Sequence, residues 1–325
     1  MNSIAEKYIR KETLPFIFCP GCGHGIVVNA FLRVLDKLNI GENEMGLVSG
    51  IGCSSWAPVY IDMDCLHTLH GRALAQAEGL KAVNPDKKVV VFSGDGACAG
   101  IGGNHLIHAA KRNVDITVIM MSNYIYGMTG GQRAPTTPYG AITKTSPLGN
   151  EEHPFDMYKL VTGAGATYYA RASVTHPIQL EKAIEEGINH KGFSFIEVLS
   201  PCPTTAGRNI FSFKTPTEMY DWYEQQVAVL KPGQTDYTEA QKVYAKVTAP
   251  GVYTFDLGGQ WVTGLRIDPD SVGGVPTRLD GVVLNPVQPW YLRFVPTGAQ
   301  WRLLLFAPAV GAAFACLAVD VFRKK

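Results

Sequence analysis

At about 100–200 residues per domain, the 325 residues of the chain allow two or three domains with a sizeable core. Hydrophobic residues make up 46% of the chain and charged residues 18%, a composition that excludes a disordered protein. The net charge of +1 argues against a generic nucleic-acid binder, and seven cysteines are too few for a disulfide scaffold of this length.

The N-terminal segment is charged where a secretory signal needs an apolar stretch. Its charged residues are Glu6, Lys7, Arg10, Lys11 and Glu12. Because no apolar run follows them, we expect no signal peptide and a cytoplasmic protein. In that compartment, neighbouring cysteines serve metal binding or catalysis rather than disulfide bonds.

Helical and strand-like segments alternate through the first three-quarters of the chain. Apolar periodicity predicts helices over 25–38, 71–83, 104–112 and from Pro177 to Ile188. Short apolar runs predict strands at 45–49, 89–92, 115–121, 167–171 and 193–199. This alternation is typical of an α/β fold with a doubly wound parallel sheet, whose site lies at the carboxyl ends of the strands.

Four cysteines are placed where a metal centre could form. Cys19 and Cys22 belong to a C-x-x-C loop rich in Pro and Gly, and Cys53 and Cys202 each follow the end of an expected strand. Four thiolates suit zinc or a [4Fe–4S] cluster, and a redox-active C-x-x-C pair is a third interpretation. The spacing of the four cysteines is compatible with all three interpretations. The remaining cysteines are expected to be buried apolar thiols: Cys65, Cys98 and Cys316.

A second group of residues joins two consecutive strand ends. Asp95 lies in a Gly-Asp-Gly turn directly after the strand 89–92, where it offers a hard oxygen ligand for Mg²⁺. Asn123 follows Asp95 by 28 residues, the length of one strand–helix–strand crossover. The Asn123 side chain and the Ile125 carbonyl could complete a site for Mg²⁺ and a diphosphate. Alone, Gly-Asp-Gly is equally well explained as a turn.

Together these motifs resemble the β subunit of the 2-oxoacid:ferredoxin oxidoreductases, and most of all the 2-oxoglutarate type. The resemblance rests on Gly-Asp-Gly followed by Asn, on the string from Ile125 to Gln132, and on the Cys-Pro-Gly-Cys-Gly-His sequence that ends at His24. It covers residues 10–230. It implies that residues 1–247 form the diphosphate-binding domain of the thiamine diphosphate-binding fold.

The resemblance also implies the roles of individual residues. A [4Fe–4S] cluster would be held by Cys19, Cys22, Cys53 and Cys202. The Mg²⁺ ligands would be Asp95, Asn123 and the backbone carbonyl of Ile125. The contacts to thiamine diphosphate would come from Ile51, Gly52, Cys53, Ser54, His70, Gly96, Ala97, Gly127 and Met128. His70 is in addition a candidate catalytic residue, although by itself it would be taken for a packed or solvated histidine.

The implied reaction is the oxidative decarboxylation of a 2-oxoacid, here 2-oxoglutarate, to acyl-coenzyme A and CO₂. Electrons would leave through the cluster to ferredoxin. Pyruvate or a branched-chain 2-oxoacid stays open as the substrate, because some relatives have a cationic Lys where this chain has Gly130. A non-oxidative thiamine diphosphate enzyme is a second alternative, and a zinc-stabilised, membrane-tethered binding protein without catalysis is a third.

Residues 248–325 differ in composition from the rest of the chain. They contain no Lys, Glu or His between Thr248 and Arg323, are rich in Gly and Pro, and include β-like runs at 252–257 and 281–284. Residues 303–319 form an uncharged run of 17, the lower limit for a membrane span. A membrane contact, a buried helix and a docking segment are all open for this extension.

The implied fold supplies only one of the two domains between which thiamine diphosphate lies. The pyrimidine-binding half, with the glutamate that activates the aminopyrimidine, should then come from a separate α subunit. We predict that the chain alone oxidises no 2-oxoacid. An assay of the purified single chain checks this, and full 2-oxoacid oxidation without a second subunit would contradict it.

Overall fold

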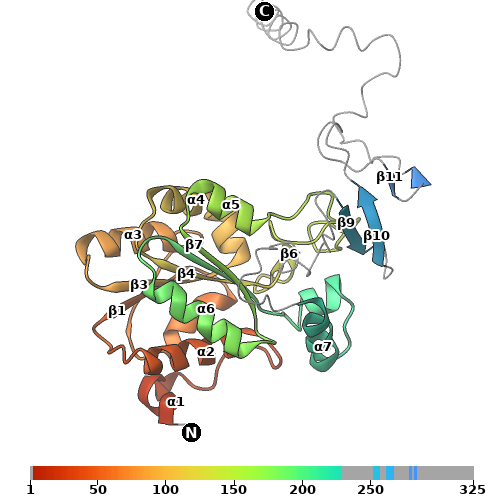
Figure 1. Cartoon of the computed structure of the whole chain (residues 1–325). Coiled ribbons are helices and arrows are strands. Elements are labelled where there is room, and N and C mark those ends of the chain that lie inside the picture. Colours follow the sequence, from red (N-terminus) through yellow and green to blue (C-terminus); the bar gives the residue numbers. More distant parts are fainter. Residues whose placement is uncertain (1–2, 228–251, 257–260, 267–277, 280–281, 284–325) are drawn as a thin grey trace, which may run out of the picture. The chain divides into compact units, whose positions relative to one another are not determined.

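The computed structural model describes residues 3–227, 252–256, 261–266, 278–279 and 282–283 (Figure 1). The chain divides into two compact units. The first unit comprises Met1–Ala249 and Thr254–Val262, and the second comprises Pro250–Tyr253 and Thr263–Lys325. The apolar run 303–319 and Cys316 lie outside the described residues, and so does the boundary expected near residue 247. Each of these expectations therefore stays a prediction.

The first unit is built on a six-stranded sheet in the order β2-β1-β3-β4-β8-β7. Every neighbouring pair in it is parallel. The strands are β1 (Met45–Ser49), β2 (Asp64–His67), β3 (Lys88–Gly94), β4 (Thr117–Ser122), β7 (Tyr168–Ser173) and β8 (Ser194–Leu199). All residues of β1, β4 and β8 are buried, as strands covered on both faces require. The predicted α/β fold with a parallel sheet is confirmed.

Helices cover both faces of the sheet because alternate strand residues point to opposite sides. On one face, α2 (His24–Lys37) and α6 (Pro177–Asn189) pack on a core that includes Phe92. On the other face, α3 (Ala73–Val83), α4 (Gly103–Arg112) and α5 (Met157–Ala164) pack on a second core, to which the adjacent Val91 belongs. The two layers of helices are visible on either side of the sheet in Figure 1.

Several elements of this unit were not predicted from the sequence, among them β2, α5 and α7 (Pro216–Gln226). Strand β2 is exposed at all four positions, so it has no apolar pattern to reveal it. Cys65 belongs to this edge strand and is exposed, so the prediction of a buried thiol there was wrong. Cys98 is buried, as predicted.

The described residues beyond 250 form a four-stranded sheet in the order β12-β11-β10-β9. Its strands are β9 (Val252–Asp256), β10 (Trp261–Arg266), β11 (Arg278–Leu279) and β12 (Val282–Val283). The pairs β10–β11 and β11–β12 are antiparallel. Within the part of the chain that the structure describes, no helix has both the length and the apolar character needed to cross a bilayer.

Candidate functional site

Most of the predicted site residues lie in loops at the carboxyl edge of the parallel sheet. The loop 51–54 follows β1, Asp95 follows β3, Asn123 follows β4 and Cys202 comes shortly after β8. These four strands are consecutive neighbours in the sheet. Their carboxyl ends therefore bring the four loops together, as expected for a doubly wound fold.

The C-x-x-C loop precedes α2, yet hydrogen bonds fasten it to the loop after β8. The N–H of Gly23 donates to the carbonyl of Pro201 at 3.1 Å. The buried Nδ1 of His24 is hydrogen-bonded to the Ser200 hydroxyl at 2.7 Å. A Cβ on Gly23 would lie only 2.6 Å from that hydroxyl, so the approach requires glycine. These contacts place the first two cysteines beside the segment that leads to Cys202.

The four predicted cluster cysteines are close enough for their charges to interact. Burial raises the pKa of the Cys22 thiol to about 12, and the charges of Cys202, Cys53 and Cys19 also raise it. Burial likewise raises the pKa of Cys53 to about 11, with Cys202 and Cys19 again adding to the effect. Ionising all four thiols together is therefore unfavourable unless a positive centre compensates their charge.

Thr204 and Thr205, which no sequence pattern indicates, lie beside Cys202, and with the four cysteines they form the cysteine site. The hydroxyl of Thr204 lies 3.9 Å from the Sγ of Cys19 and 3.5 Å from that of Cys202. The Cys202 Sγ is also 3.1 Å from the Thr205 hydroxyl and accepts from the Thr205 N–H at 3.5 Å. Although burial raises the pKa of Cys202, these hydrogen bonds bring it below its ordinary value. The hydrogen bonds from Thr204 and Thr205 thus favour a thiolate at Cys202.

The four thiols of the cysteine site lie near one another without forming the ligand sphere of a single ion. Among the residues that the structure describes, no group of three or more Cys, His, Asp or Glu side chains could hold one metal ion. The charge interactions among the cysteines act over a longer range than direct coordination. The proximity of the four thiols is the feature of the structure that bears on a shared metal centre.

Asp95 connects the ends of β3 and β4. Its Oδ1 accepts from the N–H of Gly96 at 2.9 Å, and its Oδ2 accepts from the N–H of Tyr124 at 2.7 Å and from the hydroxyl of Thr136. Burial raises the pKa of Asp95 to about 6, and these hydrogen bonds oppose the rise. Asn123 and Ile125 flank the residue that donates to Asp95, so the three predicted Mg²⁺ ligands are brought together.

Tyr126 covers the glycine-rich turn after Asp95. Its hydroxyl donates to the carbonyl of Gly96 at 2.8 Å, and a Cβ on Gly96 would collide with its ring. The ring of His70 packs edge-on against it, with 5.9 Å between the centroids. Burial lowers the pKa of His70, and its buried Nδ1 has no hydrogen-bond partner among the described residues. A ligand bound at this turn could satisfy that nitrogen.

The cysteine-bearing loops approach two neighbouring segments, one at Gly127 and the other at Gly94. A Cβ on Gly127 would lie 3.2 Å from the Thr205 hydroxyl and 3.8 Å from the Sγ of Cys202. A Cβ on Gly94 would lie 3.1 Å from the hydroxyl of Ser54, the residue after Cys53. A group held by the cysteines is therefore next to whatever binds at the turn.

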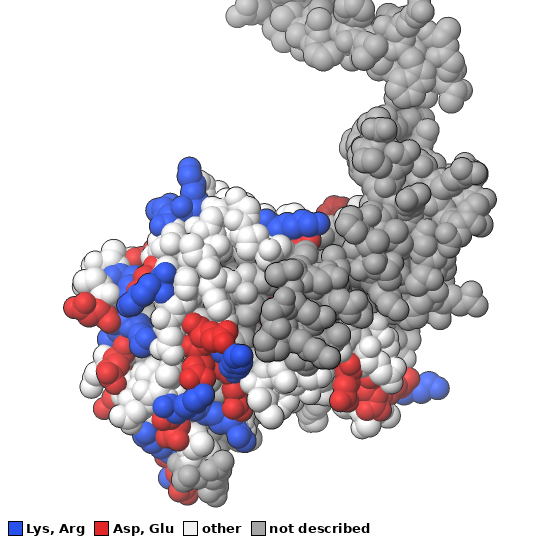
Figure 2. Space-filling view, viewed as in Figure 1, with Lys and Arg blue, Asp and Glu red and all other residues white. Residues whose placement is uncertain are grey.

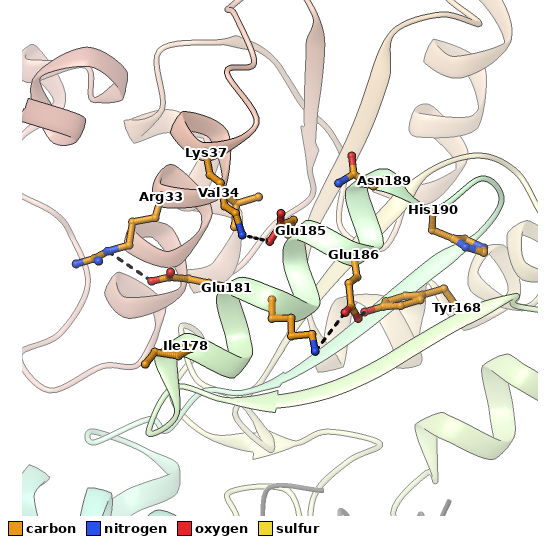
Figure 3. A pocket seen from close by; sticks show the side chains of 11 residues that line it. Arg33, Val34, Lys37, Tyr168, Ile178, Glu181, Glu185, Glu186, Asn189 and His190 are labelled. Atoms are coloured by element: carbon orange, nitrogen blue, oxygen red, sulfur yellow. Dashed lines mark hydrogen bonds and ion pairs between the residues drawn. The ribbon is translucent and has the colours of Figure 1, made fainter. Parts of the chain in front are cut away.

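A groove of about 760 Å³ lies elsewhere, between α2 and α6 (Figure 3). Its charged side chains already pair with one another, as Lys37 does with Glu185 at 2.6 Å and Arg33 with Glu181 at 3.5 Å. None of the predicted site residues lines it. On the face seen in Figure 2, acidic and basic side chains are interspersed. Neither feature indicates a second charged ligand site.

Comparison with known proteins relates the chain to thiamine diphosphate enzymes. Residues 40–198 match the family "Thiamine pyrophosphate enzyme, C-terminal TPP binding domain". The chain is 54% identical over 221 residues to 2-oxoglutarate synthase subunit KorB of Methanocaldococcus jannaschii, covering 68% of this chain and 82% of that one. It is 53% identical over 213 residues to the subunit of the same name from Methanothermobacter thermautotrophicus, covering 66% and 74%.

A solved structure agrees with these relatives. The 2-oxoglutarate:ferredoxin oxidoreductase from Magnetococcus marinus, with 2-oxoglutarate, coenzyme A and succinyl-CoA bound, matches with a TM-score of 0.66 and 36% sequence identity. The match covers 72% of this chain and 76% of that one. The likeness therefore extends over most of the described residues.

The hydrogen bond between His24 and Ser200 should contribute measurably to stability. Replacing Ser200 by Ala leaves a buried ring nitrogen without its partner, so we expect the free energy of unfolding to fall by about 1–3 kcal/mol in urea denaturation. The matched control is Ser146→Ala, at a half-buried serine whose hydroxyl forms no hydrogen bond among the described residues. It should change stability by less than about 0.5 kcal/mol. Equal free energies of unfolding for Ser200→Ala and Ser146→Ala would contradict a stabilising hydrogen bond between His24 and Ser200.

Proposed function

Because the chain belongs to the KorB family of 2-oxoglutarate:ferredoxin oxidoreductase β subunits, we propose that its carboxyl-edge loops hold the cofactors that oxidise 2-oxoglutarate. The proposed reaction converts 2-oxoglutarate and coenzyme A to succinyl-CoA and CO₂, and the electron pair goes to ferredoxin. The observation that carries the proposal is the meeting of the Asp95 turn and the four cysteines at one sheet edge. Membership of an oxidoreductase family rules out the non-catalytic zinc protein.

Asp95, Asn123 and the Ile125 carbonyl would hold Mg²⁺. All three offer hard oxygen ligands, which Mg²⁺ prefers. The divalent charge would keep the Asp95 carboxylate ionised and so offset the effect of burial on its pKa. In the proposed complex this ion anchors the diphosphate of the cofactor.

Thiamine diphosphate would be held by the glycine turns and by His70. When bound, the cofactor accepts the electron pair that decarboxylation leaves behind. The absence of a side chain at Gly96 makes room for the Tyr126 ring, whose hydroxyl fixes the Gly96 carbonyl. The side chains of Ile51 and Met128 are exposed, and the pyrimidine-binding α subunit would close the site over them.

Cys19, Cys22, Cys53 and Cys202 would hold a [4Fe–4S] cluster. The four thiols lie near one another at one sheet edge, and the relatives of the chain are ferredoxin oxidoreductases, which together support an iron–sulfur cluster over zinc. The hydrogen bonds to Cys202 favour its thiolate form, which an iron ligand needs. Since Cys53 lies in the 51–54 loop and Cys202 lies against Gly127, electrons would have only a short distance to travel from the substrate.

An assay of the anaerobically purified α–β complex tests the function. We expect 2-oxoglutarate to reduce ferredoxin in a reaction that requires coenzyme A. Reduction with pyruvate or a branched-chain 2-oxoacid, but not with 2-oxoglutarate, would overturn the proposed substrate. Release of CO₂ without ferredoxin reduction would instead indicate a non-oxidative enzyme.

A single cysteine substitution tests the cluster separately. Cys53→Ser should remove most of the iron and the broad visible absorbance of the complex, because a cluster ligand is lost. Cys65→Ser is the matched control, since Cys65 is an exposed cysteine on the edge strand β2 and should leave the iron content unchanged. Wild-type iron in the Cys53→Ser protein would contradict the assignment.

A further inference from the structure

An ammonium group lies over the loop that carries two of the predicted cofactor contacts. Gly127 begins a turn in which the N–H of Gly130 donates to the Gly127 carbonyl at 3.0 Å. The Nζ of Lys144 is 2.6 Å from the point that a Cβ on Gly130 would occupy, and its Cε is 3.6 Å from that point. The Lys144 side chain is therefore folded across the turn.

The backbone holds this side chain in register with the turn. The N–H of Lys144 donates to the Gly131 carbonyl at 2.9 Å, and the adjacent Thr145 hydroxyl accepts from the Arg133 N–H at 2.9 Å. Gly130 has φ +106°, which disfavours any L side chain. A cation at this place is therefore supplied across the turn by Lys144 more readily than by residue 130 itself.

The ammonium of Lys144 has no partner among the described residues, unlike the guanidinium groups of Arg133 and Arg72. Arg133 pairs with Glu152 at 2.6 Å, and the Arg72 guanidinium donates to the carbonyl of Ile101 at 3.1 Å. Among the described residues, Lys144 Nζ forms neither an ion pair nor a hydrogen bond, and the residue is exposed. It is free to bind an anionic group that enters the site.

We propose that Lys144 binds the distal carboxylate of 2-oxoglutarate and so selects a dicarboxylic substrate. The inference rests on the proposed function and on Gly127 and Met128 lying beside the cofactor. The keto carbon must reach the cofactor, while the second carboxylate, two methylene groups further, extends away from it. A cation just outside the cofactor loop can pair with that second carboxylate. A monocarboxylic acid such as pyruvate has no second carboxylate to pair with the cation.

The test compares Lys144→Met with wild type in the α–β complex. A charge-assisted contact is worth about 1.5–3 kcal/mol, so the KM for 2-oxoglutarate should rise by about 10- to 100-fold. We expect kcat to change by less than about threefold, because the lost contact also exists in the ground state. The thermal stabilisation of the complex by 2-oxoglutarate should fall in parallel, which gives a readout independent of turnover.

Three comparisons make the result specific. Lys144→Arg should recover most of the affinity, and Lys182→Met, at an exposed lysine that lines the separate groove between α2 and α6, should behave as wild type. The KM for coenzyme A and the kcat/KM for pyruvate should not change. An unchanged KM for 2-oxoglutarate in Lys144→Met overturns the proposal. So does an increase in the KM for coenzyme A, which would assign the ammonium to the phosphates of that substrate.

The outcome is separable from the failure of the proposed function. If the wild-type complex oxidises no 2-oxoglutarate, the function itself is wrong. If it oxidises 2-oxoglutarate with the same KM in Lys144→Met, only the role of Lys144 is wrong.

Discussion

The buried carboxylate of Asp95 is the interaction on which the site depends. A carboxylate taken out of water needs compensating donors, and here the donors come from the next strand end, at Tyr124, and from Thr136 in a later loop. Satisfying one side chain thus fixes the relative positions of three segments. In the proposed complex, the oxygen atoms held in this way face Mg²⁺ and the diphosphate.

The cysteine site lies at the same edge of the sheet as Asp95, but its residues come from other segments of the chain. The C-x-x-C loop precedes α2, and the His24–Ser200 hydrogen bond ties it to the loop after β8. The close approach of Gly127 to Cys202 then places the cysteine site next to the turn that begins at Gly127. This close approach favours glycine at position 127, because a side chain there would press on the Thr205 hydroxyl and approach the sulfur of Cys202.

The sequence predicted the sheet and the approximate location of the site because both depend on simple patterns. Solid apolar runs mark β1, β3, β4 and β8, and parallel strands must end at a common edge. Strand β2 lacked that signal because every residue in it is exposed. Its exposure is also the reason that Cys65 was wrongly predicted to be buried.

Contacts between loops could not be predicted from the same patterns. Thr204 and Thr205 follow Cys202 in an ordinary polar stretch, and only the fold shows their hydroxyls beside the sulfur atoms. Lys144 is 14 positions beyond Gly130, and no periodicity relates the two. The sequence showed only that position 130 lacks a cation, whereas the structure shows one lying over it.

The central claim is that electrons from the substrate enter a cluster held by this chain beside the cofactor turn. It is tested most directly by the visible spectrum of the anaerobic α–β complex, recorded before and after 2-oxoglutarate and coenzyme A are added without ferredoxin. The account predicts that the first electron from the substrate bleaches the iron–sulfur absorbance, and that the absorbance returns when oxidised ferredoxin is supplied to accept both electrons, one at a time. An unchanged spectrum in a complex that nevertheless releases CO₂ would contradict it.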